Sequence, residues 1–90
     1  MENDPVVQEV RERISELDRA ILAAFNERLD LVQRLWAHKR EQGFDVVDPG
    51  REARMLEELR SANGGPLSDE GVRGLLDAIL GLTRREAGKG

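Results

Sequence analysis

The chain has 90 residues, enough for one small domain, and carries a formal net charge of −4 with no cysteine and one histidine. These counts exclude a disulfide framework, a thiolate metal site and a multi-histidine metal site within one chain. Acidic and basic residues are interleaved and aromatic residues are few, so neither nucleic acid nor a metal is an expected partner. The acidic N-terminus has no continuous apolar run, which predicts no signal peptide and no membrane span, and we expect a cytoplasmic protein.

The first predicted element is a very long helix over about residues 5–42, because no glycine or proline occurs between Pro5 and Gly43. Its apolar residues step by three and four positions and share one face: Val7, Val10, Ile14, Leu17, Ile21, Ala24, Leu31 and Leu35. Such a helix extends about 57 Å, whereas a compact domain of this size is only about 30 Å across. We therefore expect a second chain to cover part of the stripe, in a crossed or antiparallel homodimer.

Two cations interrupt the second half of this stripe. Arg28 stands where the next apolar residue is due, and Lys39 lies about 20° around the helix and about 16 Å along its axis from Arg28. Burying unpaired cations costs several kcal/mol each, so a face that keeps them is expected to bind an anion, here a small dianion. The alternatives are that Arg28 extends into solvent or pairs with Asp18, Asp30 or Glu52, and that Lys39 is solvated.

A second, shorter helix is predicted over about residues 49–62. Gly43 is expected to end the first helix, and Asp48 and Pro49 to supply the N-cap and the first position of the second. The apolar side of this helix carries Met55, Leu56 and Leu59.

A third helix is predicted over about residues 68–86, with Ser68 as its N-cap after the breaking sequence Asn63–Pro66. Its apolar stripe contains five residues: Val72, Leu75, Leu76, Ile79 and Leu82. Residues 1–90 are therefore expected to form a single all-α domain of three helices.

In their order and spacing, the polar motifs resemble the all-helical, AroQ-type chorismate mutases over nearly the whole chain. The likeness rests on Arg11-x-x-Ile14-x-x-Leu17-Asp18, Glu27-Arg28, Lys39, Asp48-x-x-Arg51-Glu52 and Thr83 in the last helix. The resemblance implies the intertwined homodimer of the chorismate mutase II fold and the Claisen rearrangement of chorismate to prephenate in aromatic amino acid biosynthesis. This reaction is pericyclic, so the resemblance implies no cofactor and no metal.

Carried over by motif, the resemblance implies four catalytic residues. Arg28 and the partner's Arg11 would bind the two carboxylates of the substrate. Lys39 would donate to the ether oxygen and to a carboxylate, and Glu52 would accept from the ring hydroxyl. A plain first-turn acid favoured by the helix dipole is the alternative for Glu52.

The resemblance also implies residues that bind substrate. Asp48 would assist through its backbone, and Arg51 would support the carboxylate end. Thr83 stands at a serine position that contacts the ring carboxylate, although its hydroxyl can equally bond back to the helix. Where the family has a second donor to the ether oxygen, this chain has Ala87, with Glu86 one residue earlier. Glu86 would donate only when protonated, which predicts activity that falls as pH rises.

Other functions stay open on the same fold. Trp36 is either ordinary core or reshapes the pocket for a relative of chorismate, so a 4-amino-4-deoxychorismate mutase and an isochorismate pyruvate-lyase are alternatives. An alternative of another class is a non-catalytic dimeric module that binds a dicarboxylate or a partner protein. If neither residue 86 nor residue 87 serves this position, a chain that is slow on its own, or one boosted by a partner enzyme of the shikimate pathway that orders the C-terminus, is a further expectation.

Overall fold

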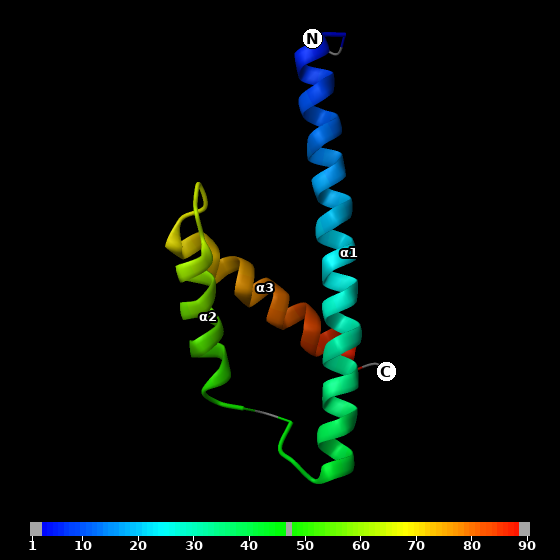
Figure 1. Cartoon of the computed structure of the whole chain (residues 1–90), viewed down its shortest axis with the longest axis vertical. Helices are drawn as coiled ribbons and strands as arrows, with labels where there is room; N and C mark the ends of the chain where they lie inside the picture. Colours follow the sequence, from blue (N-terminus) through cyan, green and yellow to red (C-terminus); the bar gives the residue numbers. More distant parts are fainter. Residues whose placement is uncertain (1–2, 47, 89–90) are drawn as a thin grey trace.

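The computed structural model describes residues 3–46 and 48–88. Residues 1–2, 47 and 89–90 of the predicted domain lie outside this part. Three helices follow one another: α1 (Pro5–Gln42), α2 (Arg51–Ala62) and α3 (Asp69–Ala87) (Figure 1). The described ranges contain no strand, so the prediction of an all-α fold with a very long first helix is confirmed.

Both ends of α1 are set by local sequence. The Asp4 side chain accepts hydrogen bonds from the backbone N–H groups of Val6, at 2.8 Å, and Val7, at 3.3 Å, and Pro5 occupies the first turn. At the other end Gly43 adopts a left-handed conformation with φ of 74°, which a glycine reaches without steric cost. Since nothing between these two signals breaks the helix, it continues for 38 residues.

α2 begins at Arg51, later than expected, and Asp48 is not its N-cap. The carbonyl of Asp48 accepts the N–H of Arg51 at 3.1 Å, and the Asp48 side chain accepts the N–H of Gly50 at 3.3 Å. Residues 48–51 therefore form a β-turn with Pro49 at its second position, a placement that proline favours. Gly50 takes the N-cap position without a side-chain hydrogen bond, and the Asp48 carboxylate instead pairs with Arg54 at 3.0 Å.

α3 packs against both α1 and α2 and lies between them, as its diagonal course in Figure 1 shows. The predicted N-cap is confirmed, because the Ser68 hydroxyl accepts the N–H of Gly71 at 3.0 Å. The buried side chains of α3 are Val72, Leu76, Thr83 and Ala87. Leu75 and Leu82, which the sequence pattern assigned to the same stripe, remain 53% and 40% exposed and face away from that contact.

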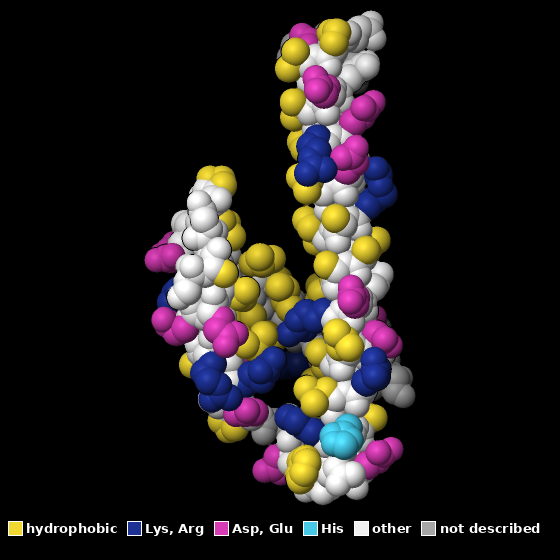
Figure 2. Space-filling view, in the orientation of Figure 1, with side chains coloured by type: hydrophobic (Ala, Val, Ile, Leu, Met, Phe, Trp, Pro, Cys, Tyr) yellow, Lys and Arg dark blue, Asp and Glu magenta, His cyan; other side chains and the backbone are white. Residues whose placement is uncertain are grey.

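The first half of α1 has no neighbour among the other described helices (Figure 1). The molecule measures 58 × 28 × 17 Å and its radius of gyration is 17.1 Å, against about 12 Å for a compact domain of this length. No residue of α1 is buried. Figure 2 shows hydrophobic side chains along the edge of its free half. Six hydrophobic residues of this half are at least 45% exposed: Val6, Val10, Ile14, Leu17, Ile21 and Leu22. An apolar face of this size is typical of an interface.

Within the described part of the chain, no helix combines the length and the apolar character that a membrane crossing requires.

Candidate active site

A cavity of about 310 Å³ lies where the second half of α1 meets the 43–50 connection, the start of α2 and the end of α3. This volume is within the range of small-molecule sites. Figure 2 shows lysine and arginine side chains gathered in this region, between α1 and the other two helices. The cavity is lined by six charged residues, namely Arg28, Lys39, Asp48, Arg51, Glu52 and Arg84, and by seven others, namely Val32, Leu35, Trp36, Val46, Met55, Leu80 and Thr83.

The charges of the lining match a doubly negative ligand. Four of the lining residues are cations and two are acids, which leaves a formal excess of two positive charges. Both acids already have partners, because Asp48 pairs with Arg54 and Glu52 pairs with Arg84. No ion pair of the described chain includes Arg28, Lys39 or Arg51. The cavity is therefore electrostatically suited to a small dianion.

Arg28 is held by a hydroxyl and not by a carboxylate. Its Nη1 donates to the Thr83 Oγ1 at 2.7 Å, and the Thr83 hydroxyl donates in turn to the Ile79 carbonyl at 2.6 Å. Burial, and secondly the charge of Arg51, lower the pKa of Arg28 below its usual value. Both effects disfavour the guanidinium charge, and an anion placed between Arg28 and Arg51 would offset both.

Lys39 and Trp36 enter the cavity from the same part of α1. Lys39 is half-buried, whereas the neighbouring His38 is exposed and lies outside the lining. Trp36 is half-buried in the wall, so it shapes the cavity as well as contributing to packing. Arg28 and Lys39, predicted to share a face, therefore point into one space with an aromatic wall between their positions.

Arg84 is a cavity residue that the sequence reasoning missed. It stands beside Arg85 in the last turns of α3, where cations commonly complement the helix dipole. The positions of Arg84 and Arg85 relative to Thr83 and Ala87 do not indicate which of the two arginines faces the cavity. The ion pair between the Arg84 Nη2 and the Glu52 Oε1, across 32 positions of sequence, distinguishes the two arginines only once the chain is folded.

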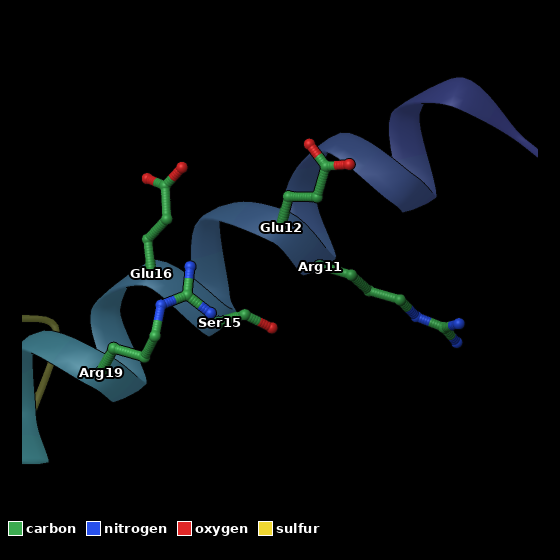
Figure 3. A pocket seen from close by; sticks show the side chains of 5 residues that line it. All are labelled: Arg11, Glu12, Ser15, Glu16 and Arg19. Carbon is green, nitrogen blue, oxygen red and sulfur yellow. The ribbon is translucent and has the colours of Figure 1, made fainter.

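Arg11 lies far from the cavity of its own chain. It precedes Arg28 by 17 residues, which is about 25 Å along the helix axis, too far for one side chain to span. Figure 3 shows Arg11 extending away from the helix, on a side different from that of Glu12 and Glu16. With Glu12, Ser15, Glu16 and Arg19 it lines a shallow groove on a single helix, which encloses nothing unless another chain covers it.

The end of α3 brings neither Glu86, the expected donor, nor Ala87, at the family's donor position, into the lining. Glu86 is half-buried and Ala87 is 8% exposed, and neither residue lines the cavity. The cavity thus contains six of the eight residues singled out from the sequence, and Arg11 and Glu86 are the two it does not contain. In the described ranges no three His, Cys, Asp or Glu side chains cluster as metal ligands would.

Comparisons with known proteins agree with this geometry. The family model of the type II chorismate mutases matches residues 10–87. A structure of the chorismate mutase from Thermus thermophilus (form II) is 33% identical, with a TM-score of 0.84, covering 91% of this chain and 93% of the other. The form I structure of the chorismate mutase from the same organism is 35% identical, with a TM-score of 0.81 and coverages of 86% and 96%. No curated protein matches this chain.

Proposed function

Because the chain belongs to the type II chorismate mutase family, we propose that its cavity binds chorismate and converts it to prephenate, a step of aromatic amino acid biosynthesis. The observation that carries this proposal is the formal excess of two positive charges around a cavity of about 310 Å³. Chorismate is a small dicarboxylate, so its charge complements the lining. The reaction needs no nucleophile, proton transfer or cofactor, which leaves the protein the tasks of holding the reactive conformer and stabilising developing charge.

Lys39 is the proposed donor to the ether oxygen. Negative charge accumulates on that oxygen as its bond to the ring breaks. A cation already in place there stabilises the transition state more than the ground state, and this lowers the barrier. Lys39 is half-buried in the cavity wall and has no ion-pair partner within the described chain, so its ammonium group is available to a ligand.

Arg28 and Arg51 are the proposed carboxylate ligands from the same chain, with Thr83 orienting Arg28. The Thr83 hydrogen is used on the Ile79 carbonyl, so the hydroxyl oxygen is the atom that accepts from Arg28. This chain of hydrogen bonds fixes the guanidinium on the cavity side of α1. Such a fixed arginine binds a carboxylate with little loss of side-chain freedom.

A homodimer is the proposed assembly, and the partner's Arg11 is proposed to complete each site. The exposed apolar face of α1 needs a cover, and a second copy provides an identical face of equal length. An antiparallel crossing of two α1 helices would bring the first half of one beside the second half of the other. Arg11 would then reach the second carboxylate.

Glu52 is the proposed acceptor for the ring hydroxyl, with the backbone near Asp48 in support. A binding role for Glu86 requires the last turn of α3 to rearrange and stays a prediction of the sequence, which a pH–rate profile tests: a flat profile from about pH 5 to 8 would argue against it. A partner enzyme that orders this end and a cytoplasmic location also stay predictions.

The test is a turnover assay of the purified chain with chorismate, 4-amino-4-deoxychorismate and isochorismate, followed by product analysis. Prephenate from chorismate is the expected result. Predominant turnover of the amino substrate, or release of pyruvate from isochorismate, would replace chorismate as the substrate. If a bicyclic dicarboxylate that mimics the transition state binds in calorimetry while none of the three substrates reacts, the chain is a binding module and the proposal of catalysis is wrong.

A further inference from the structure

The two acids of the cavity differ in where their partners lie. Asp48 is paired by Arg54, which is not part of the lining. Glu52 is paired by Arg84, and both of these side chains line the cavity. The pair joins the first turn of α2 to the last turns of α3. It is therefore the one ion pair of the described chain whose two charges both face the ligand space.

An unpaired Glu52 would oppose a dianion. A carboxylate in the wall repels the negative charges of the ligand, and it attracts any ligand that carries a positive group instead. Arg84 offsets both effects because its guanidinium lies against the Glu52 carboxylate. A guanidinium has five N–H groups, so a hydrogen bond to Glu52 leaves other N–H groups of Arg84 free to donate. The pair therefore presents an acceptor oxygen of Glu52 beside N–H donors of Arg84.

We propose that Arg84 is a specificity-determining residue, which together with Glu52 selects a ring hydroxyl over a ring ammonium group. The inference rests on the proposed function, in which Glu52 accepts from the ring hydroxyl. A hydroxyl donates one hydrogen and accepts through its oxygen, so it matches Glu52 and Arg84 together. A protonated aliphatic amine, as in 4-amino-4-deoxychorismate, offers only donors and adds a charge of the same sign as Arg84. The pair thus favours chorismate.

Arg84→Gln tests this proposal, with Arg85→Gln as the matched control. Both changes remove one exposed guanidinium from the same turn of α3, but Arg84 lines the cavity and Arg85 does not. The Arg84 and Glu52 side chains are 62% and 55% exposed, and exposed pairs add little to stability, so both variants are expected to fold. Circular dichroism and thermal unfolding check that point.

For Arg84→Gln we expect kcat/KM with chorismate to fall about 10-fold or more, the range for losing a hydrogen bond to a charged group. The ratio of kcat/KM for chorismate to that for 4-amino-4-deoxychorismate is expected to fall further, because the amino substrate gains from the uncovered Glu52. Arg84→Lys, which keeps the charge, is expected to restore most of the ratio. An unchanged ratio in Arg84→Gln, or an equal change in Arg85→Gln, would overturn the proposal.

A binding measurement separates this inference from the proposed function. Calorimetric titration compares a bicyclic dicarboxylate carrying the hydroxyl with the same compound lacking it. The native chain is expected to favour the hydroxyl form, and Arg84→Gln to lose about 10-fold or more of that preference. If the native chain leaves chorismate unreacted but prefers the hydroxyl form, and Arg84→Gln loses that preference, the catalytic proposal fails and the role of Arg84 stands. If both chains show equal preference, the role of Arg84 is refuted whatever the turnover.

Discussion

The two halves of α1 share one helix and one apolar periodicity but have different surroundings. From Val10 to Ile21 the stripe is bare, and its large apolar side chains are at least 45% exposed. From Arg28 to Lys39 the helix faces α3 and the cavity, and cations replace part of the stripe. No other described helix covers the apolar face of the first half. In the second half, Arg28 and Lys39 have no carboxylate partner within the described residues.

This difference shows that a single periodic helix can present two kinds of unsatisfied surface. Apolar area exposed to water favours association with another apolar face, at about 25 cal/mol per Å² buried. Cations held near each other, with the pKa of Arg28 lowered by burial and by Arg51, favour an anion instead. We therefore propose that one helix carries the surfaces for both the assembly and the ligand.

The largest expected effect comes from disrupting the apolar face on the first half of α1. Ile14→Asp places a charge in the centre of the stripe, and in a symmetric dimer each copy adds one, so the interface buries two unpaired carboxylates at several kcal/mol each. We expect sedimentation velocity to show loss of the dimer, and activity to disappear with it. Glu9→Ala, off the stripe, is the control. A dimeric Ile14→Asp protein would show that another surface mediates association.

Replacing Lys39 changes the cavity on the second half of α1 and leaves the apolar face of the first half intact. Lys39→Ala is expected to lower kcat/KM for chorismate on the order of 10³-fold, as loss of one donor to a developing oxyanion does, while the dimer persists. The neighbouring Arg40→Ala, exposed and outside the lining, is expected to leave the rate unchanged. If kinetics of Lys39→Ala match those of the native protein, Lys39 has no part in the mechanism.

Filling the cavity should stabilise the fold. A bicyclic dicarboxylate at about 100 times its Kd contributes roughly 2.7 kcal/mol per site. Two sites per dimer contribute roughly 5.4 kcal/mol, which corresponds to a rise in Tm of roughly 10–20 °C for a dimer of this size. The matching monocarboxylate is expected to give a smaller rise, because one of the two charges is missing. Equal rises with both compounds, measured by differential scanning calorimetry, would mean that the second charge is not recognised.

The smallest expected effect is on stability, in Arg28→Met. A base whose folded-state pKa is lowered binds its proton more weakly in the folded chain than in the unfolded one, so its charge opposes folding at every pH below that lowered pKa. Replacing it is expected to leave Tm unchanged or raise it by a few degrees, while activity is lost. Arg34→Met, at an exposed position of the same helix, is the control for both readouts. A clear fall in Tm would show that Arg28 stabilises the empty protein.

The fold was readable where sequence signals act locally. The long uninterrupted helix and the Ser68 cap each depend on a few adjacent residues, so the pattern alone indicates them. The start of α2 was not readable, because Asp48 can cap a helix, close a turn or pair with Arg54. In the folded chain the Asp48 side chain closes the turn and also pairs with Arg54. The prediction of an Asp48 N-cap was wrong because this side chain has several competing partners.

The candidate site was readable as a set of charged residues but not as a network. Spacing on one helix places Arg28 and Lys39 together, since both positions share a face. The bond from Arg28 to Thr83 and the pair of Arg84 with Glu52 join residues 55 and 32 positions apart. No local pattern records such contacts, and this is why Arg84 was missed.

Mixing two inactive variants tests most directly whether each cavity is completed by the other chain. Arg11→Ala and Lys39→Ala chains are unfolded together, refolded and assayed with chorismate. If Arg11 acts across the interface, half of the dimers are mixed and each has one intact site, so about a quarter of native activity returns. If the mixture is no more active than its two parents while mixed dimers are present, Arg11 does not serve the partner's site, and the claim that two chains build each site is contradicted.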